Sequence, residues 1–492
     1  MKKTATLTDG RTIEYDHSDN PLKGGMKEVH FSTDGKHALC FYHDQSLAMD
    51  DNRLHRLESI LGNFDPTTSG SAGGSAKDST SADYYKTVFC WVTGIIVSPK
   101  FGILTDKYSK NYFFQDGRFK GKDKEGTWFT KPKLRKMIPK HESGHFLGFL
   151  MLCRRMAMGV QKMHMTGLAH SDLSNKNVLV DPSSGSCMII DIDSLVVPGI
   201  FDADVVGTPG YIAPEIIRTT HLKLNDSKRK FPCNWTDLHS LAVLIYEYLL
   251  KRHPLRGPKV NSTASSEEDE RFSMGERAVF IEHPIDKSNR PGSSAKDPSF
   301  RKELDPCIAA LGPHLEKCFL KAFADGLHKP RSRPTATMWV DALARTLDLL
   351  VPCSNQACEG KWFVYLDGKK QKCPWCGVKP FGPFPVVDLH FAPRPGQYRN
   401  EGRQVVCHNE KKLHEWHVLS NKRMDEYSNT TLLADVQFHQ GNWLMINRDL
   451  NTLVSDGGNP VPKGQATKLK EGAEIILSRS EKGRLAVVKL VN

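Results

Sequence analysis

The chain has 492 residues, of which 39% are hydrophobic and 25% are charged, and its formal net charge is +12. This length allows two or three domains, each with its own core, and the composition excludes a disordered or fibrous chain. The basic residues are scattered, and none of their runs interleaves with aromatic residues. We therefore interpret the excess charge as a general field and do not expect nucleic-acid binding.

The apolar segments are too short for a membrane protein. The residues after Met1-Lys2-Lys3 are mostly polar from Thr4 to Arg11, which excludes the apolar core of a secretory signal. The longest apolar run, Leu241 to Leu250, contains Glu247 and falls well short of a bilayer span. We expect a cytoplasmic protein whose 12 cysteines are free, metal-bound or catalytic, not paired as disulfides.

The first part of the chain has the pattern of a β-rich lobe. Alternating apolar and polar positions predict strands within residues 1–60, and strand-like runs return at 88–97 and 101–105. Leucine and isoleucine at helical spacing predict a helix over 47–61. Residues 64–82 are rich in Gly, Ser and Thr, which predicts a flexible insertion with too little apolar content to pack.

The next part is helical. Periodicity predicts helices over 148–164 and 237–250, and it resumes over 305–350 after a polar, loop-rich stretch. Strands first and helices after indicate an α+β fold with two lobes. We place the N-lobe at about 1–106 and the C-lobe at about 107–348, a single domain over 1–348.

The strongest chemical signal lies between His170 and Glu215. It comprises His170-Ser171-Asp172-Leu173-Ser174-Asn175-Lys176-Asn177, then Ile190-Asp191-Ile192-Asp193, then Gly207-Thr208-Pro209-Gly210-Tyr211-Ile212-Ala213-Pro214-Glu215. Asp172 can accept a proton from a substrate hydroxyl, and Asn177 and Asp191 can hold Mg²⁺ or Mn²⁺ on nucleotide phosphates. In order and spacing these motifs resemble the catalytic core of eukaryotic-type protein kinases. The resemblance implies a two-lobed kinase fold that uses ATP and protein substrates.

Further residues extend the resemblance. Thr208 matches the substrate-groove Thr of Ser/Thr kinases, so we expect Ser and Thr hydroxyls as acceptors. Asp237 matches the residue that caps the backbone amides of the catalytic loop, and Arg333 matches the Arg that pairs with Glu215 in a buried ion pair.

The nucleotide site departs from the kinase pattern. A kinase holds the phosphates with a strand Lys that pairs with a helix Glu, but the expected Lys position here is Cys40. Lys27 follows Gly24 and Gly25 in the hairpin and can reach the same phosphates, which resembles the with-no-lysine kinases. We expect Lys27 to be the phosphate-binding cation and Gly24 and Gly25 to let the backbone approach the phosphates. Glu58 is the expected partner of Lys27, with Asp50 and Asp51 as weaker candidates. An exposed hairpin Lys and a solvated helix Glu are the competing interpretations.

Cys40, Ser174 and Asp193 favour a second hypothesis, a pseudokinase scaffold that binds nucleotide weakly and presents the C-terminal domain. Ser174 replaces a Lys near the transferred phosphate. Ser171 replaces the Arg that binds an activation-loop phosphate, which argues against regulation by such a phosphate. Asp193 replaces the Gly of the metal-binding motif, where it adds charge or restrains the segment. The retained Asp172, Asn177 and Asp191 favour an enzyme. A kinase for small molecules is a third hypothesis, against which Thr208 and the Ala-Pro-Glu segment argue.

Residues 349–380 contain four cysteines in paired spacing: Cys353, Cys358, Cys373 and Cys376. Two short cysteine turns can place four thiolates tetrahedrally around Zn²⁺, and the Cys-Pro-x-Cys-Gly turn is a common zinc-knuckle form. We expect a closed, structural zinc ribbon. A redox dithiol at Cys373 and Cys376 is the alternative.

Residues 381–492 consist of short alternating segments separated by Gly, Asn and Asp turns, which predicts a small β-sandwich. The segment Leu469 to Leu477 resembles the closing hairpin of forkhead-associated domains, which implies an interaction module that binds a protein. The arrangement, with Gly-Gly-Met-Lys-x-Val, is similar to kinase-like proteins of bacterial tellurite-resistance and stress gene neighbourhoods. That resemblance implies stress signalling beside a cognate phosphatase.

Overall fold

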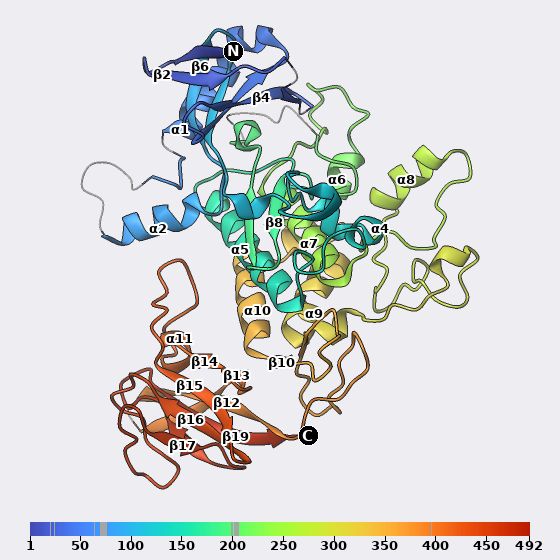
Figure 1. The fold of residues 1–492 in the computed structure, drawn as a ribbon. Helices are drawn as coiled ribbons and strands as arrows, with labels where there is room; N and C mark the ends of the chain where they lie inside the picture. The colour runs from blue at the N-terminus through green and yellow to red at the C-terminus, as the bar shows by residue number, and fades with distance from the viewer. Residues whose placement is uncertain are drawn as a thin grey trace. The chain divides into compact units, whose positions relative to one another are not determined.

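The computed structural model of the chain (Figure 1) describes residues 1–19, 21–23, 25–62, 64–68, 76–197, 200, 206–394 and 396–492. The chain divides into two compact units. Unit 1 comprises Met1–Gly144, Leu152–Glu303 and Phe319–Trp339, and unit 2 comprises His145–Met151, Leu304–Cys318 and Val340–Asn492. None of the helices in the described residues combines the length and the apolar character that a membrane crossing requires.

Unit 1 begins with a seven-stranded sheet in the order β2-β1-β6-β7-β5-β4-β3. Its strands are β1 (Lys2–Leu7), β2 (Thr12–Asp16), β3 (Leu22–Lys23), β4 (Lys27–Ser32), β5 (His37–Tyr42), β6 (Val92–Ser98) and β7 (Gly102–Asp106). Strand β2 also pairs with β4, with Tyr15 opposite Ser32, so the sheet curls back on itself. Buried residues of the alternating pattern fill its inside: Ala5, Leu7, Tyr15, Leu39, Phe41, Ile96 and Leu104. The strands expected from sequence in this lobe are therefore present.

The helix expected over 47–61 is divided at Asp50. The structure has a 3₁₀ helix, η1 (Gln45–Met49), followed by the α-helix α1 (Asp51–Leu61). The division has a local cause, because the carboxylate of Asp50 accepts hydrogen bonds from the backbone N–H groups of Asn52 and Arg53 and so caps α1.

The expected insertion at 64–82 is only partly described. Residues 69–75 and residue 63 lie outside the described residues. From Ala76 the chain forms helix α2 (Ala76–Lys86), so residues 76–82 are helical and not the unstructured stretch that the composition predicted. Tyr85, near the end of α2, is buried and gives this helix an apolar anchor that lies just beyond the Gly/Ser/Thr-rich stretch.

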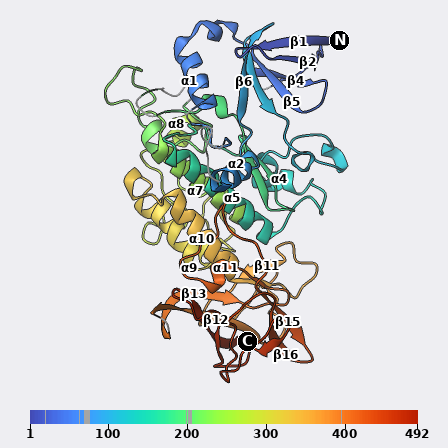
Figure 2. The same ribbon diagram turned by 90° about the vertical axis from the view of Figure 1, so that its left-hand side faces the viewer.

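The rest of unit 1 is mainly helical and lies beneath the sheet in the views of Figure 1 and Figure 2. Its helices are α3 (Thr127–Thr130), α4 (Pro132–Arg135), most of α5 (Phe146–Met165), α6 (Pro214–Ile217), α7 (Asn234–Leu250) and α8 (Ser266–Met274). Most of α9 (Pro313–Leu320) and of α10 (Ala336–Asp348) belongs to unit 2. Helix α7 is buried along most of its length, as its apolar sequence requires. A short hairpin of β8 (Val178–Asp181) and β9 (Ser186–Ile189) follows the catalytic-loop sequence and carries it into Asp191.

Unit 2 contains a short hairpin and two four-stranded sheets. The hairpin is β10 (Leu350–Pro352) with β11 (Trp362–Val364). The sheets have the orders β13-β12-β19-β18 and β14-β15-β16-β17. Their strands are β12 (Phe384–Arg394), β13 (Gln397–Val406), β14 (Lys412–Leu413), β15 (Ala434–His439), β16 (Asn442–Asn447), β17 (Ala466–Lys468), β18 (Glu474–Ile476) and β19 (Arg484–Val491), with helix α11 (Glu415–Val418) between β14 and β15. Residues of both sheets share one apolar core, among them Val387, Val436, Met445, Ile475 and Val488.

Candidate active site

The loop that carries Asp172 is fixed from below by Asp237, in the first turn of α7. The carboxylate of Asp237 accepts hydrogen bonds from the backbone N–H groups of His170 at 2.7 Å and Ser171 at 3.2 Å. It also lies 3.1 Å from Nε2 of His164, and it is almost completely buried. Ser171 has a positive φ of 66°, which a non-glycine residue adopts only when its surroundings hold it there. Asp237 thus has the capping contacts that the sequence predicted.

His170 connects the loop to the strand that leads to Asp191. Its Nε2 lies 3.0 Å from the backbone oxygen of Ile190, and the residue is fully buried. This contact brings two of the expected site segments together: the one that carries Asp172 and the one that carries Asp191. Because the ring has a structural partner, it holds the loop in place.

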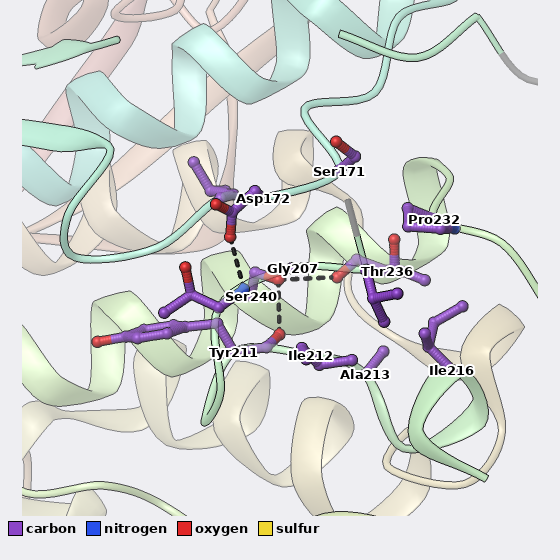
Figure 3. A pocket seen from close by; sticks show the side chains of 13 residues that line it. Ser171, Asp172, Gly207, Tyr211, Ile212, Ala213, Ile216, Pro232, Thr236 and Ser240 are labelled. Atoms are coloured by element: carbon purple, nitrogen blue, oxygen red, sulfur yellow. Dashed lines mark hydrogen bonds between the residues drawn. The ribbon is translucent and has the colours of Figure 1, made fainter. Parts of the chain in front are cut away.

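Both oxygens of the Asp172 carboxylate are held. Asn177 donates from Nδ2 to the Oδ2 atom of Asp172 at 3.0 Å and to its backbone oxygen at 2.8 Å. The carboxylate points toward the segment that contains Gly207 and Tyr211 (Figure 3), where Oδ1 accepts a hydrogen bond from the backbone N–H of Thr208 at 2.6 Å. Residues Ser171, Asp172, Gly207, Thr208 and Tyr211 are part of the lining of a small pocket at this point. The side chain of Asp172 is therefore oriented at a hollow beside the segment expected to bind the acceptor.

Lys27 lies against Asp191 and Asp193, in the segment expected to bind the metal. Its Nζ is 2.8 Å from Oδ1 of Asp191 and 2.6 Å from Oδ1 of Asp193. Burial alone would lower the pKa of the Lys27 ammonium, but the negative charges of Asp193 and Asp191 outweigh it and hold that pKa well above its usual range. Lys27 is therefore a fixed positive charge, placed at the residue expected to hold Mg²⁺.

Cys40 is on the neighbouring strand β5, opposite Val29 of β4. Burial raises the pKa of its thiol to about 12, so Cys40 is neutral. A neutral thiol supplies no charge for a phosphate. This agrees with the position of the cation, Lys27, on β4 instead of β5.

The structure does not bring Glu58 to Lys27. Glu58 lies on an exposed face of α1, and within the described chain it forms no ion pair with Lys27. Gly24 lies outside the described residues. Gly25 is described, and a Cβ added to it would meet no atom within 4 Å, so the space above this part of the hairpin is open.

The carboxylate that sequence reasoning missed is Asp193. Its side chain is 3% exposed, and its second oxygen, Oδ2, accepts a hydrogen bond from the hydroxyl of Tyr42 at 2.5 Å. The available signal was an Asp at a position where the kinase pattern has Gly. The sequence predicts an added charge or a restraint at this position, but it does not identify Asp193 as the partner of Lys27.

Glu215 and Arg333 form the expected ion pair. Nη1 and Nη2 of Arg333 donate to the two carboxylate oxygens of Glu215, each at 2.7 Å. Residues 198–199 and 201–205, between the Asp191 motif and the motif that begins at Gly207, lie outside the described residues.

Four cysteines of unit 2 form a second candidate site. The Sγ atoms of Cys353, Cys358, Cys373 and Cys376 all lie within 4.8 Å of one another. Cys353 Sγ is 3.5 Å from Cys376 Sγ, and Cys358 Sγ is 3.7 Å from Cys373 Sγ. Four thiolates at the usual Zn–S distance have their sulfurs about 3.8 Å apart in a tetrahedron. The donor set and its spacing therefore fit a closed Zn²⁺ site.

Residues 133–341 match the sequence model of the protein kinase domain. This part of the chain is similar to protein kinase domains. The match covers most of the helical part of unit 1, and it implies a two-lobed fold of mixed helices and strands that uses ATP and Mg²⁺.

Three curated relatives are similar to part of the chain. The serine/threonine-protein kinase WNG2 of Toxoplasma gondii is 35% identical over 102 residues, 21% of this chain and 18% of the relative. The kinase mrck-1 of Caenorhabditis elegans is 30% identical over 117 residues, 22% and 7% of the two chains. The probable serine/threonine-protein kinase RTK1 of Saccharomyces cerevisiae is 30% identical over 113 residues, 22% and 17%. The chain thus matches less than a fifth of the length of each of these relatives.

Proposed function

We propose that this protein is an ATP-dependent kinase that transfers the γ-phosphate to Ser and Thr hydroxyls of protein substrates. One observation carries the proposal: candidate residues from distant segments meet at one place. Lys27 of β4 contacts Asp191, while the Asp172 carboxylate accepts hydrogen bonds from Asn177 and from the backbone N–H of Thr208. A scaffold has no physical need for this set.

Asp172 is the group that would receive the proton of the acceptor hydroxyl. Since Asn177 and the Thr208 backbone each hold one of its oxygens, the carboxylate has one orientation toward the pocket. Such fixed orientation contributes to rate mainly through positioning, with a smaller share from basicity. Thr208 thereby connects the acceptor-binding segment to the residue that acts on the acceptor.

The residues present fit a metal–nucleotide. Asn177 uses its Nδ2 on Asp172, which leaves its Oδ1 for a cation, and the side chain of Asp191 is 35% exposed. Asn177 and Asp191 would hold Mg²⁺ or Mn²⁺, which neutralises charge on the phosphates when it is bound. Lys27 would bind the phosphates directly, and the open space above Gly25 leaves room for them.

The test is phosphate transfer from labelled ATP with Mg²⁺ to the protein itself or to a mixture of Ser- and Thr-containing peptides. Asp172→Asn and Asp191→Asn should each lower incorporation by roughly 10²- to 10⁴-fold, since both remove a charge that the transfer requires. Thermal melting of both variants should stay close to that of the wild type. Incorporation that is equal in the wild type and both variants would exclude the mechanism.

A pseudokinase scaffold that binds nucleotide weakly and presents unit 2 is the second candidate. The observation that favours it is Ser174, which is completely buried where kinases place a Lys near the transferred phosphate. The two functions differ in one measurement: a scaffold binds labelled nucleotide but transfers no label in the wild type.

We propose a bacterial-type kinase in the cytoplasm that acts in stress signalling beside a cognate phosphatase. Its four cysteines would hold a structural zinc, and its two C-terminal sheets would form a forkhead-associated-like sandwich that binds a partner protein. The cysteine geometry and the shared core of the two sheets support the domain assignments. Copurification of a phosphatase with the tagged chain from its own cells would test the partnership.

A further inference from the structure

Helix α1 does not supply a carboxylate to the nucleotide site. In protein kinases a helix Glu pairs with the phosphate-binding Lys and so keeps that Lys in position. The buried residues of α1 are Arg53, Arg56, Leu57 and Ile60, while Glu58 is exposed. The inward face of this helix therefore presents two guanidinium groups and no acid.

Two cations lie against the ring of Tyr42. Arg53 Cζ lies 5.3 Å from the centre of the Tyr42 ring, and the Nζ of Lys27 lies 5.6 Å from the same centre. An anion beside this buried tyrosine stabilises the two charges. The buried anion beside Tyr42 is Asp193, which Tyr42 itself contacts.

Asp191 and Asp193 both contact Lys27, but they differ in exposure. The side chain of Asp191 is 35% exposed and that of Asp193 is 3% exposed. The outer carboxylate can therefore turn to a cation on the nucleotide, while the inner one has both oxygens engaged by Lys27 and Tyr42. The backbone enforces this arrangement, because Asp191 has a positive φ of 64° and the next residues form the short helix η4 (Ile192–Ser194).

We propose that Asp193 is the residue that positions Lys27 on the nucleotide phosphates, in place of a glutamate on α1. This inference rests on the proposed function, because it assigns a role within the nucleotide site. In this arrangement the position of Lys27 depends on the segment 191–194, which carries both Asp193 and the metal-binding Asp191. One short segment therefore positions the phosphate-binding cation and the metal ligand. The nucleotide site is then built from β4, β5 and η4.

The experiment measures binding of a fluorescent ATP analogue, with and without Mg²⁺, beside the KM and kcat for ATP. Asp193→Asn should weaken nucleotide binding and raise the KM for ATP by about tenfold or more, including in the absence of Mg²⁺. Asp193→Glu should recover part of the loss because it restores the charge. Asp83→Asn is the matched control, since it makes the same change on the exposed face of α2, and it should leave binding unchanged.

The variant Glu58→Gln decides between the two anchors. If it weakens nucleotide binding as much as Asp193→Asn does, or if Asp193→Asn leaves the affinity unchanged, Asp193 is not the anchor and the inference is wrong. A purely structural role would lower the melting temperature of Asp193→Asn while its folded fraction kept the wild-type KM for ATP.

A double-mutant cycle keeps the test valid if Asp193→Asn folds poorly. Lys27→Met with Asp193→Asn removes both charges of this pair, so it should melt higher than Lys27→Met, which leaves the buried Asp193 carboxylate without its ammonium, and bind nucleotide no worse than Lys27→Met alone. Additive losses of affinity would overturn the inference. Nucleotide binding without phosphate transfer in the wild type would contradict the proposed kinase activity and leave this assignment standing, whereas a wild type that binds no nucleotide would contradict both.

Discussion

Arg333 holds Glu215 with two parallel hydrogen bonds, and three backbone carbonyl oxygens use the rest of its guanidinium. The acceptors besides Glu215 are the carbonyl oxygens of Gly326, Leu327 and Trp235, at 2.8 to 3.0 Å. The side chain of Arg333 is 1% exposed. This planar group therefore joins the end of the activation segment to the start of α7 and to the loop before α10, a geometry that Lys cannot reproduce.

The first prediction follows from that burial. Arg333→Lys and Glu215→Ala should each lower the free energy of unfolding by about 3–5 kcal/mol, because each leaves a buried charge or buried carbonyl groups without partners. Urea denaturation monitored by circular dichroism measures the change. Arg331→Lys, an exposed position two residues earlier, is the control and should be neutral within about 0.5 kcal/mol. Equal stability of Arg333→Lys and Arg331→Lys would show that the bidentate pair contributes nothing.

The second prediction concerns the relocated cation. Lys27→Met should abolish ATP turnover, because no second ammonium contacts Asp191 in the described part of the chain. Lys23→Met, in the preceding strand of the same hairpin, is the matched control and should keep turnover. Kinetics with ATP as the varied substrate separate the two. Similar losses in both variants would mean that Lys27 is an ordinary hairpin lysine.

The third prediction tests the cysteine cluster. Purified protein should carry about one zinc per chain by elemental mass spectrometry, and Cys373→Ser should lose it, because Cys373 is one of the buried members of the cluster. Cys307→Ser, outside the cluster, should keep the metal. Removal of zinc by a strong chelator should lower the melting temperature. Full-length protein without zinc, and with a disulfide between Cys373 and Cys376, would favour the redox alternative.

The residues of the catalytic loop could be predicted because their chemistry is local. Asp172 and Asn177 are five positions apart in one loop, and in the structure the side chain of Asn177 donates to the Asp172 carboxylate. Asp237 and Arg333 are distant in sequence but occupy motifs whose partners are fixed by the same chemistry. Such positions carry strong sequence signals because few residue types satisfy them.

The partner of Lys27 could not be predicted in this way. Asp193 is 166 positions from Lys27, and it reaches the ammonium only because the chain turns through a left-handed conformation at Asp191. Periodicity placed an acid on α1 but did not say which face of that helix is buried. Glu58 falls on the exposed side, and the buried side carries Arg53 and Arg56. The pairing of β2 with β4 could not be predicted for a similar reason. Alternation of apolar and polar residues indicates which face of a strand is buried, but it does not indicate which strands are neighbours in the sheet.

The last prediction is a loss of stability in mild acid that comes from a buried cluster in unit 2. Asp348, at the end of α10, is contacted by Nη2 of Arg403 at 2.8 Å, Nζ of Lys411 at 3.4 Å and Nε2 of His417 at 2.9 Å. Burial opposes ionisation of Asp348, but the His417 ring, which hydrogen-bonds to it, and the charges of Lys411 and Arg403 hold its pKa well below its usual range. Burial lowers the pKa of His417 to about 4, despite the attraction of Asp348, so the ring is neutral and donates to the carboxylate.

Both shifts act in the same direction. Between about pH 6.5 and about pH 4 the unfolded chain binds a proton at residue 417 that the folded chain does not, so stability falls as the pH is lowered through this window. Asp348 causes a further loss of stability at lower pH. Below the ordinary pKa of Asp, the unfolded chain binds a proton at this residue while the folded chain keeps the carboxylate ionised. Chemical denaturation from pH 7 to pH 4 should therefore show a decline that His417→Gln flattens, since Gln keeps a donor but does not titrate. His439→Gln, at an exposed position, should retain the wild-type slope, and identical slopes in the two variants would remove His417 as the cause.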